Sequence, residues 1–179
     1  MPGRRAAQGA IAEMIRVDHA GEFGAVQIYR GQRAVFERAP SKAHAARLIA
    51  EMEAGEAEHL KTFDRLIAER GVRPTVMAPV WRVAGFGLGA VTALMGEKAA
   101  HACTEAVEEV IEQHYAGQSE QLDGVDRELK SVVDQFREDE LAHKDTAVAQ
   151  GARQAPGYAA LSAVIKLGCR AAIRISEKI

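Results

Sequence analysis

The chain has 179 residues, of which 27% are charged, and a formal net charge of −2 at pH 7. This length is enough for a domain with a hydrophobic core, and we expect one domain over residues 1–179. A nearly neutral chain offers no strongly basic surface, so nucleic acid is not an expected partner. Aromatic residues make up only 5% of the sequence and Ala is abundant, which favours closely packed helices.

Apolar periodicity and helix breakers predict an all-α protein. Ser41 is expected to cap the second helix and Gly71 to end it. The expected helices cover approximately residues 8–38, 42–70, 97–120, 126–150 and 158–177, with a further apolar, Gly-rich segment at 80–96. We expect the helices at 8–38, 42–70, 97–120 and 126–150 to form a four-helix bundle. The segment at 80–96 and the C-terminal helix are then additions to it.

Two copies of Glu-x-x-His lie on helical stripes that are otherwise apolar. The first copy is Glu56 and His59, and the second is Glu140 and His143. A spacing of three residues keeps the carboxylate and the imidazole on one face of a helix. Carboxylates buried on facing helices need compensating positive charge. A pair of metal ions supplies that charge directly.

A further Glu precedes each copy by about one helical hairpin. Glu22 lies on an apolar stripe of the first helix, and Glu108 lies at the edge of an apolar face of the fourth. One Glu from each of two helices, with a Glu-x-x-His from each of the other two, is the ligand set of di-iron carboxylate bundles. Periodicity favours Glu108 only slightly over its neighbours, whose spacing is typical of a solvated acidic face. These neighbours are Glu105, Glu109 and Glu112.

The predicted donor set indicates the metal. Carboxylates and imidazoles suit iron or manganese better than soft metals. Four carboxylates balance the charge of two ferrous ions, and the remaining coordination positions are open to dioxygen. The pattern therefore predicts two iron ions per chain that react with O₂.

Two other features have more than one interpretation. His114 and Tyr115 lie on or beside the apolar face of the fourth helix. Contact with the metal ligands, contact with a substrate and plain core packing are all consistent with that position. The apolar residues at 80–96 fit either a cap packed on the bundle or an interfacial helix that meets lipid. The run is too short to cross a bilayer, which needs about 20 apolar residues.

Nearly the whole chain resembles the demethoxyubiquinone hydroxylase family, membrane-associated di-iron enzymes of ubiquinone biosynthesis. The resemblance is carried by IRVDHAGEFGAVQIYRGQ (15–32), EMEAGEAEHLKTF (51–63), VRPTVMAPVWRVAGFGLGAVTALMGEKAAHACTEAVEEVIEQHY (72–115), FREDELAHKD (136–145) and APGYAALSAVIKLGCRAAIRISEKI (155–179). It implies the ligand set Glu22, Glu56, His59, Glu108, Glu140 and His143. His114 and Tyr115 match a pair of residues in the family, which implies a position near the metals and the quinone.

The resemblance implies a ferritin-like bundle that hydroxylates the demethoxyubiquinol ring with O₂. It further implies an external reductant, NADH, and a peripheral position on the cytoplasmic face of a bacterial inner membrane, or on the matrix face of the mitochondrial one. A second copy of the chain and other proteins of ubiquinone biosynthesis are further expected partners. The alternative is an iron-storing ferritin or a peroxide-scavenging relative of rubrerythrin. Rubrerythrins usually add a CxxC iron domain, which this sequence lacks.

Overall fold

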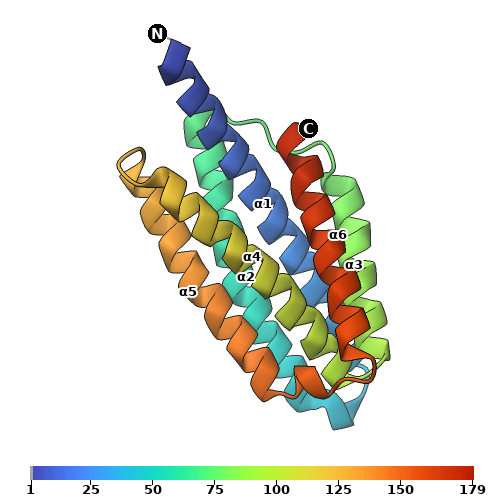
Figure 1. The fold of residues 1–179 in the computed structure, drawn as a ribbon. Helices are drawn as coiled ribbons and strands as arrows, with labels where there is room; N and C mark the ends of the chain where they lie inside the picture. The colour runs from blue at the N-terminus through green and yellow to red at the C-terminus, as the bar shows by residue number, and fades with distance from the viewer. Residues whose placement is uncertain (1) are drawn as a thin grey trace. The chain divides into compact units, whose positions relative to one another are not determined.

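The computed structural model describes residues 2–179, with side chains described from residue 8 onward. Six α-helices account for most of the chain (Figure 1). They are α1 (Pro2–Phe36), α2 (Ala43–Arg70), α3 (Ala78–Leu94), α4 (Glu97–Leu122), α5 (Arg127–Ala149) and α6 (Tyr158–Lys178), with the 3₁₀ turns η1 (Pro40–Lys42) and η2 (Ala152–Gln154). The described residues form no strand, so the predicted all-α fold class is confirmed.

The ends of the helices follow local chemistry, with one exception to the prediction. Gly71 ends α2 in the left-handed conformation at φ 61°, where glycine is favoured. The side chain of Asp126 caps α5 by accepting from the backbone N–H of Leu129 at 3.0 Å. The predicted cap Ser41 is wrong. It lies inside η1, which Pro40 begins, and Lys42 precedes α2 without a capping side chain.

The chain divides into two compact units. Unit 1 comprises Met1–Val91 and Ala171–Ile179, and unit 2 comprises Thr92–Arg170. In unit 1 α1 packs on α2, and in unit 2 α4 packs on α5 and η2. Each unit thus contains one of the two predicted helical hairpins. A single domain over residues 1–179 stays a prediction.

In unit 1, α3 lies directly against the backbone of α1. A Cβ atom on Gly85 would come 2.9 Å from the carbonyl oxygen of Gly24, and one on Gly89 would meet that of Ile28. From the other side, a Cβ on Gly31 would meet the carbonyl of Phe86. These three glycines therefore allow a helix crossing that any larger residue would hold apart.

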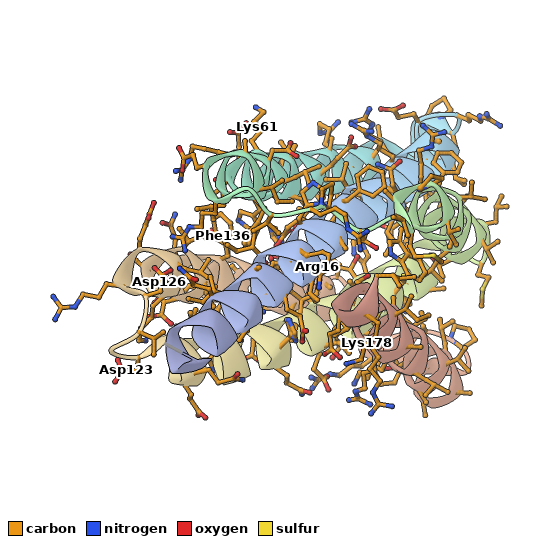
Figure 2. The ribbon with its side chains drawn as sticks, turned by 90° about the horizontal axis from the view of Figure 1, so that it is seen from above. Arg16, Lys61, Asp123, Asp126, Phe136 and Lys178 are labelled. Atoms are coloured by element: carbon orange, nitrogen blue, oxygen red, sulfur yellow. The ribbon has the colours of Figure 1, made fainter. Side chains whose placement is uncertain are left out.

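The last turns of α6 also belong to unit 1. Arg16 on α1 donates from Nε to the carbonyl of Ser176 at 3.1 Å and from Nη2 to that of Glu177 at 2.9 Å. The indole of Trp81 on α3 donates to the hydroxyl of Ser176 at 3.2 Å. Figure 2 shows Arg16 on α1 and Lys178 at the end of α6. The C-terminal end of α6 is thereby tied to both α1 and α3.

The apolar stripes predicted from periodicity form the interior of each unit. In unit 1 they bury Ile15, Tyr29, Met52, Phe63 and Leu66, and in unit 2 they bury Cys103, Val107, Leu129, Val133 and Phe136. Burial of this kind stabilises a domain by about 25 cal/mol for each Å² of apolar surface removed from water. The carboxylates of both Glu-x-x-His copies lie within these stripes.

Candidate metal centre

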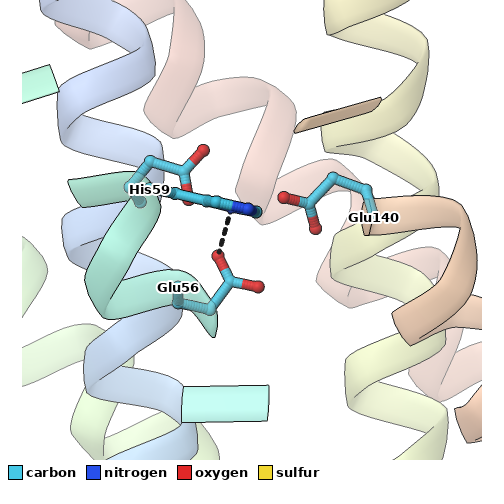
Figure 3. Close-up of side chains that lie close together, drawn as sticks. Glu56, His59 and Glu140 are labelled. Atoms are coloured by element: carbon cyan, nitrogen blue, oxygen red, sulfur yellow. Dashed lines mark ion pairs between the residues drawn. The ribbon is translucent and has the colours of Figure 1, made fainter. Parts of the chain in front are cut away.

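Unit 1 brings together three of the predicted ligands. Glu22 comes from α1, and Glu56 and His59 come from α2; the two carboxylates are 0% exposed and His59 is 4% exposed. Nδ1 of His59 lies 3.6 Å from Oε2 of Glu22 and 3.7 Å from Oε2 of Glu56. Figure 3 shows the second of these ion pairs as a dashed line. The three side chains form what we call triad 1.

Unit 2 repeats this arrangement. Glu108 comes from α4, and Glu140 and His143 come from α5; both carboxylates are buried, and His143 is partly buried. Nδ1 of His143 lies 3.8 Å from Oε2 of Glu140. One donor atom from each of the three lies within 4.8 Å of the others. These side chains form triad 2.

Both triads have the spacing of ligands around a metal ion. Separations of 3.6–3.8 Å between imidazole nitrogen and carboxylate oxygen exceed those of hydrogen bonds. Donors bound to one ion at about 2.0 to 2.2 Å lie about 3 to 4 Å from each other. Two carboxylates and one imidazole per triad form a hard-to-borderline donor set that suits iron or manganese. The residues present therefore fit metal binding in each unit.

The structure separates Glu108 from its three rivals. Glu105 accepts from Nε of Arg153 at 2.8 Å, and Glu112 accepts from Arg137 at 2.8 Å. Glu109 pairs with Nζ of Lys166, also at 2.8 Å. The expectation of a solvated acidic face was wrong for Glu105, which is 1% exposed. Glu109 and Glu112 are partly exposed, and each of the three pairs with a cation from another element of unit 2.

His114 and Tyr115 both lie close to Gln118, one turn further along α4. Tyr115 is buried, as is Gln118. The amide nitrogen of Gln118 lies 2.9 Å from Nε2 of His114. With that nitrogen as donor, Nε2 accepts and the ring proton of neutral His114 resides on Nδ1. The rings of His114 and Tyr115 have centroids 6.5 Å apart and are tilted by 45°.

Sequence reasoning missed a buried carboxylate one turn before Glu56. Glu53 on α2 is 8% exposed. It accepts from Nε of Arg30 at 3.1 Å and from Nη1 of Arg33 at 2.6 Å, both on α1. Its position three residues before Glu56 was the available signal, because that spacing places it beside the ligand stripe.

The chain is similar to known proteins over almost its whole length. Residues 9–176 match the model of the family described as ubiquinone biosynthesis protein COQ7. The chain is similar to the 3-demethoxyubiquinol 3-hydroxylase of Rhodospirillum rubrum, with 49% identity over 179 residues, which is 100% of this chain and 83% of the relative.

Eukaryotic relatives are similar over the same region. The mitochondrial NADPH-dependent 3-demethoxyubiquinone 3-hydroxylase of Homo sapiens is 45% identical over 176 residues, covering 96% of this chain and 79% of the relative. The mitochondrial 5-demethoxyubiquinone hydroxylase of Saccharomyces cerevisiae is 40% identical over 189 residues, covering 97% and 80%.

Proposed function

The chain belongs to the ubiquinone biosynthesis protein COQ7 family, and from this premise we propose that it hydroxylates the ring of a demethoxyubiquinol. The observation that carries the proposal is the repeated triad of two buried carboxylates and one imidazole, one triad in each unit. The relatives that share most of the chain are named as hydroxylases rather than as iron stores or peroxidases. No observation favours the ferritin or rubrerythrin alternative.

We propose that the chain binds two iron ions. The ligands would be Glu22, Glu56 and His59 from triad 1, and Glu108, Glu140 and His143 from triad 2. Two ferrous ions carry the charge that balances four carboxylates, so the buried set can remain ionised. When bound, the iron pair supplies the reduction of dioxygen that side chains alone do not perform.

The protein's own contribution is to fix the donors and their protonation. In both triads Nδ1 of the His faces a carboxylate, so this nitrogen is the one placed to bind metal. Metal binding at Nδ1 requires the neutral imidazole, whose proton is then on Nε2. Gln118 holds His114 in one orientation beside Tyr115. We propose that His114 and Tyr115 contact the quinol ring.

The reductant is a reduced nicotinamide nucleotide in this proposal. The human relative is named as NADPH-dependent, whereas the family resemblance implied NADH. The hydroxylation consumes two electrons and two protons for each O₂, with one oxygen atom entering the ring and the other leaving as water. Parallel assays with NADH and NADPH decide between the two nucleotides.

We further propose that the protein acts at a membrane surface as a peripheral protein. None of the described helices is long and apolar enough to cross a bilayer. Apart from Arg82, the exposed side chains of α3 and of Met95 after it are nevertheless apolar, and α6 also exposes Val164 and Leu167. The exposed apolar residues of α3 and of the position after it are Val80, Val83, Phe86, Val91, Leu94 and Met95. Exposed apolar surface on neighbouring turns is typical of an interaction surface. Relatives in eukaryotes are named as mitochondrial, and we propose the inner membrane as the site of action.

Aerobic turnover of the iron-loaded protein tests the proposed reaction. The assay combines a short-tailed demethoxyubiquinone analogue, NADH or NADPH and ¹⁸O₂, with mass analysis of the product. We expect a quinone that has gained one labelled oxygen atom. Protein that binds iron but yields no oxygenated product with either nucleotide or with chemically reduced substrate would overturn the proposal. A very large shell on gel filtration would instead support iron storage.

Phe86→Glu combined with Leu94→Glu tests the membrane proposal. Because charges on the exposed side of α3 oppose insertion into lipid, the variant should leave liposomes. Its activity on a long-tailed substrate should fall much more than on a short-tailed one. Equal losses on both substrates, with liposome binding intact, would make α3 a structural cap.

A further inference from the structure

Charge is unevenly distributed along the chain. All 25 acidic residues lie outside segments 71–96 and 155–176, although the chain as a whole carries a net charge of −2. The first segment contains Arg73 and Arg82, and the second contains Lys166, Arg170 and Arg174. These segments include α3 and most of α6, the two helices that expose the most apolar side chains. Cationic charge and exposed apolar surface therefore occur on the same elements.

On α6 the cations form a row. Lys166, Arg170, Arg174 and Lys178 follow one another at four-residue steps, which keeps them along one side of a helix. Nζ of Lys166 forms an ion pair with Oε1 of Glu109 at 2.8 Å, and the Lys166 side chain is 19% exposed. The remaining three are exposed. We call Arg170, Arg174 and Lys178 the α6 cation row.

The end of this row lies beside the start of α3. Ser176, between Arg174 and Lys178, accepts from the indole of Trp81 at 3.2 Å. Arg82 follows Trp81 and is exposed, as is Val83 at 72%. Because Arg16 holds the carbonyls of Ser176 and Glu177, this part of α6 is fixed in place on unit 1. An indole, exposed cations and exposed apolar side chains are thus held together, as on helices that lie in a lipid interface.

We propose that the α6 cation row, with Arg82, binds the phosphate groups of anionic phospholipids while the exposed side of α3 contacts acyl chains. This inference rests on the proposed membrane docking and names the kind of lipid that the docking surface recognises. A polyanion such as nucleic acid would offer nothing to the exposed apolar residues. The charge complementarity and the apolar neighbours together favour an anionic membrane surface.

Trp81 makes the proposal directly measurable, because it is the only tryptophan in the chain. Its fluorescence emission should shift to shorter wavelength when vesicles of phosphatidylcholine with phosphatidylglycerol are added. Each basic residue near an anionic surface strengthens binding by about fivefold. The variant R170Q/R174Q/K178Q should therefore weaken binding to these vesicles by at least about tenfold, and added salt should weaken wild-type binding. Binding to pure phosphatidylcholine vesicles should differ little between the two proteins.

The matched control removes the same charge elsewhere. Arg38, Arg47 and Arg127 are exposed and lie outside α3 and α6. The variant R38Q/R47Q/R127Q should bind anionic vesicles as the wild type does. Thermal unfolding by circular dichroism establishes that both variants are folded before they are compared.

Three results would overturn the proposal. The first is equal wild-type affinity for anionic and neutral vesicles, and the second is equal weakening by the two triple variants. The third is equal wild-type affinity for soluble polyglutamate and for vesicles of the same total charge, which would leave no role for acyl chains and identify an acidic polypeptide as the ligand. The proposed hydroxylation is judged separately, by product mass with a short-tailed analogue and no vesicles, so failure of either proposal is distinguishable from failure of the other.

Discussion

Arg33 and Glu53 form an ion pair of 2.6 Å between Nη1 and Oε2, and this pair joins α1 to α2 one turn before Glu56. Arg30 donates to the other oxygen of Glu53 at 3.1 Å. The carboxylate is therefore held by two arginines of the helix that also carries Glu22. This clamp sets the register of α1 against α2, and so the distance between the two carboxylates of triad 1.

The first prediction concerns this clamp. Glu53→Gln leaves the two arginines without a buried counter-charge and should lower the free energy of unfolding by about 1 to 3 kcal/mol. Chemical denaturation measures the change. Glu58→Gln is the control, because Glu58 pairs with Lys61 at 2.5 Å with both side chains about 70% exposed, and loss of such a pair should cost under about 0.5 kcal/mol. Equal effects of the two substitutions would mean that Glu53 does not hold the helices together.

The second prediction concerns the crossing of α3 and α1. Gly89→Ala places a methyl group against the carbonyl of Ile28, and the resulting shift of helices should cost about 1 to 3 kcal/mol. Gly87 lies on the same helix with nothing within 4 Å of an added Cβ atom. Gly87→Ala should therefore stabilise the protein, by about 0.5 to 1 kcal/mol, through better helix propensity. Thermal unfolding of the two variants should move in opposite directions, and a shared direction would contradict the close approach.

The third prediction concerns triad 2. Glu140→Ala removes a fully buried carboxylate, and we expect loss of at least one of two iron ions. Loss of a residue that only supports a metal ligand typically lowers activity by up to about 100-fold. Because Glu140 is itself a proposed ligand, turnover should fall by more than that. Iron analysis and the oxygenation assay measure the two effects. Glu138→Gln, at an exposed position two residues away, is the control and should keep both. Full iron content and normal turnover in Glu140→Ala would remove Glu140 from the ligand set.

The fourth prediction concerns metal removal. The two buried carboxylates of each triad repel one another when no cation is bound, so chelation should lower the melting temperature near neutral pH. A ligand present at 100 times its dissociation constant stabilises the folded state by about 2.7 kcal/mol. Reloading with ferrous ions under anaerobic conditions should restore stability and release protons into weakly buffered solution. Unchanged stability after complete chelation would show that the carboxylates do not share a metal-binding site.

The fifth prediction concerns pH. Burial raises the pKa of the Cys103 thiol to about 12, partly opposed by a hydrogen bond with Thr92. The unfolded chain loses this proton near pH 9, so the thiol's contribution to stability is complete below pH 9 and is lost as pH rises toward 12. The loss is about 1.4 kcal/mol per pH unit within that window.

Cys103→Ala provides the comparison for this effect. The wild type should lose stability between pH 9 and 11 more steeply than the variant, as measured by denaturation at several pH values. Parallel curves over that range would show that the thiol is not buried. Cys169, whose pKa burial raises to about 11, remains in both proteins and cancels in the difference.

Much of the fold could be predicted from the spacing of apolar residues, because a helix that buries one side carries apolar residues at steps of three and four. Glu56 and Glu140 were recognisable as unusual since each interrupts an apolar stripe, and both are fully buried. Gly71 was recognisable as a helix end since its left-handed conformation strongly favours glycine. In each case the constraint is local and acts through neighbours on the same helix.

Other features depend on residues distant in the chain and had no local signal. Glu105 and Arg153 are 48 positions apart, and only folding brings them to 2.8 Å. Periodicity therefore treated Glu105 as a surface residue, although it is 1% exposed. Ser41 failed as a cap for a local reason, since Pro40 favours the first position of a helical turn and shifts the start of α2 beyond the serine.

The two histidines of the triads differ in their access to water, with His59 6% and His143 16% exposed at the side chain. Water reaches a partly exposed donor more easily and competes with it for the metal. If each triad holds one of the two proposed ions, the ion next to His143 would therefore exchange faster than the ion next to His59. During chelation triad 2 would then lose its ion before triad 1, and the protein would behave as if it had one resident ion and one exchangeable ion.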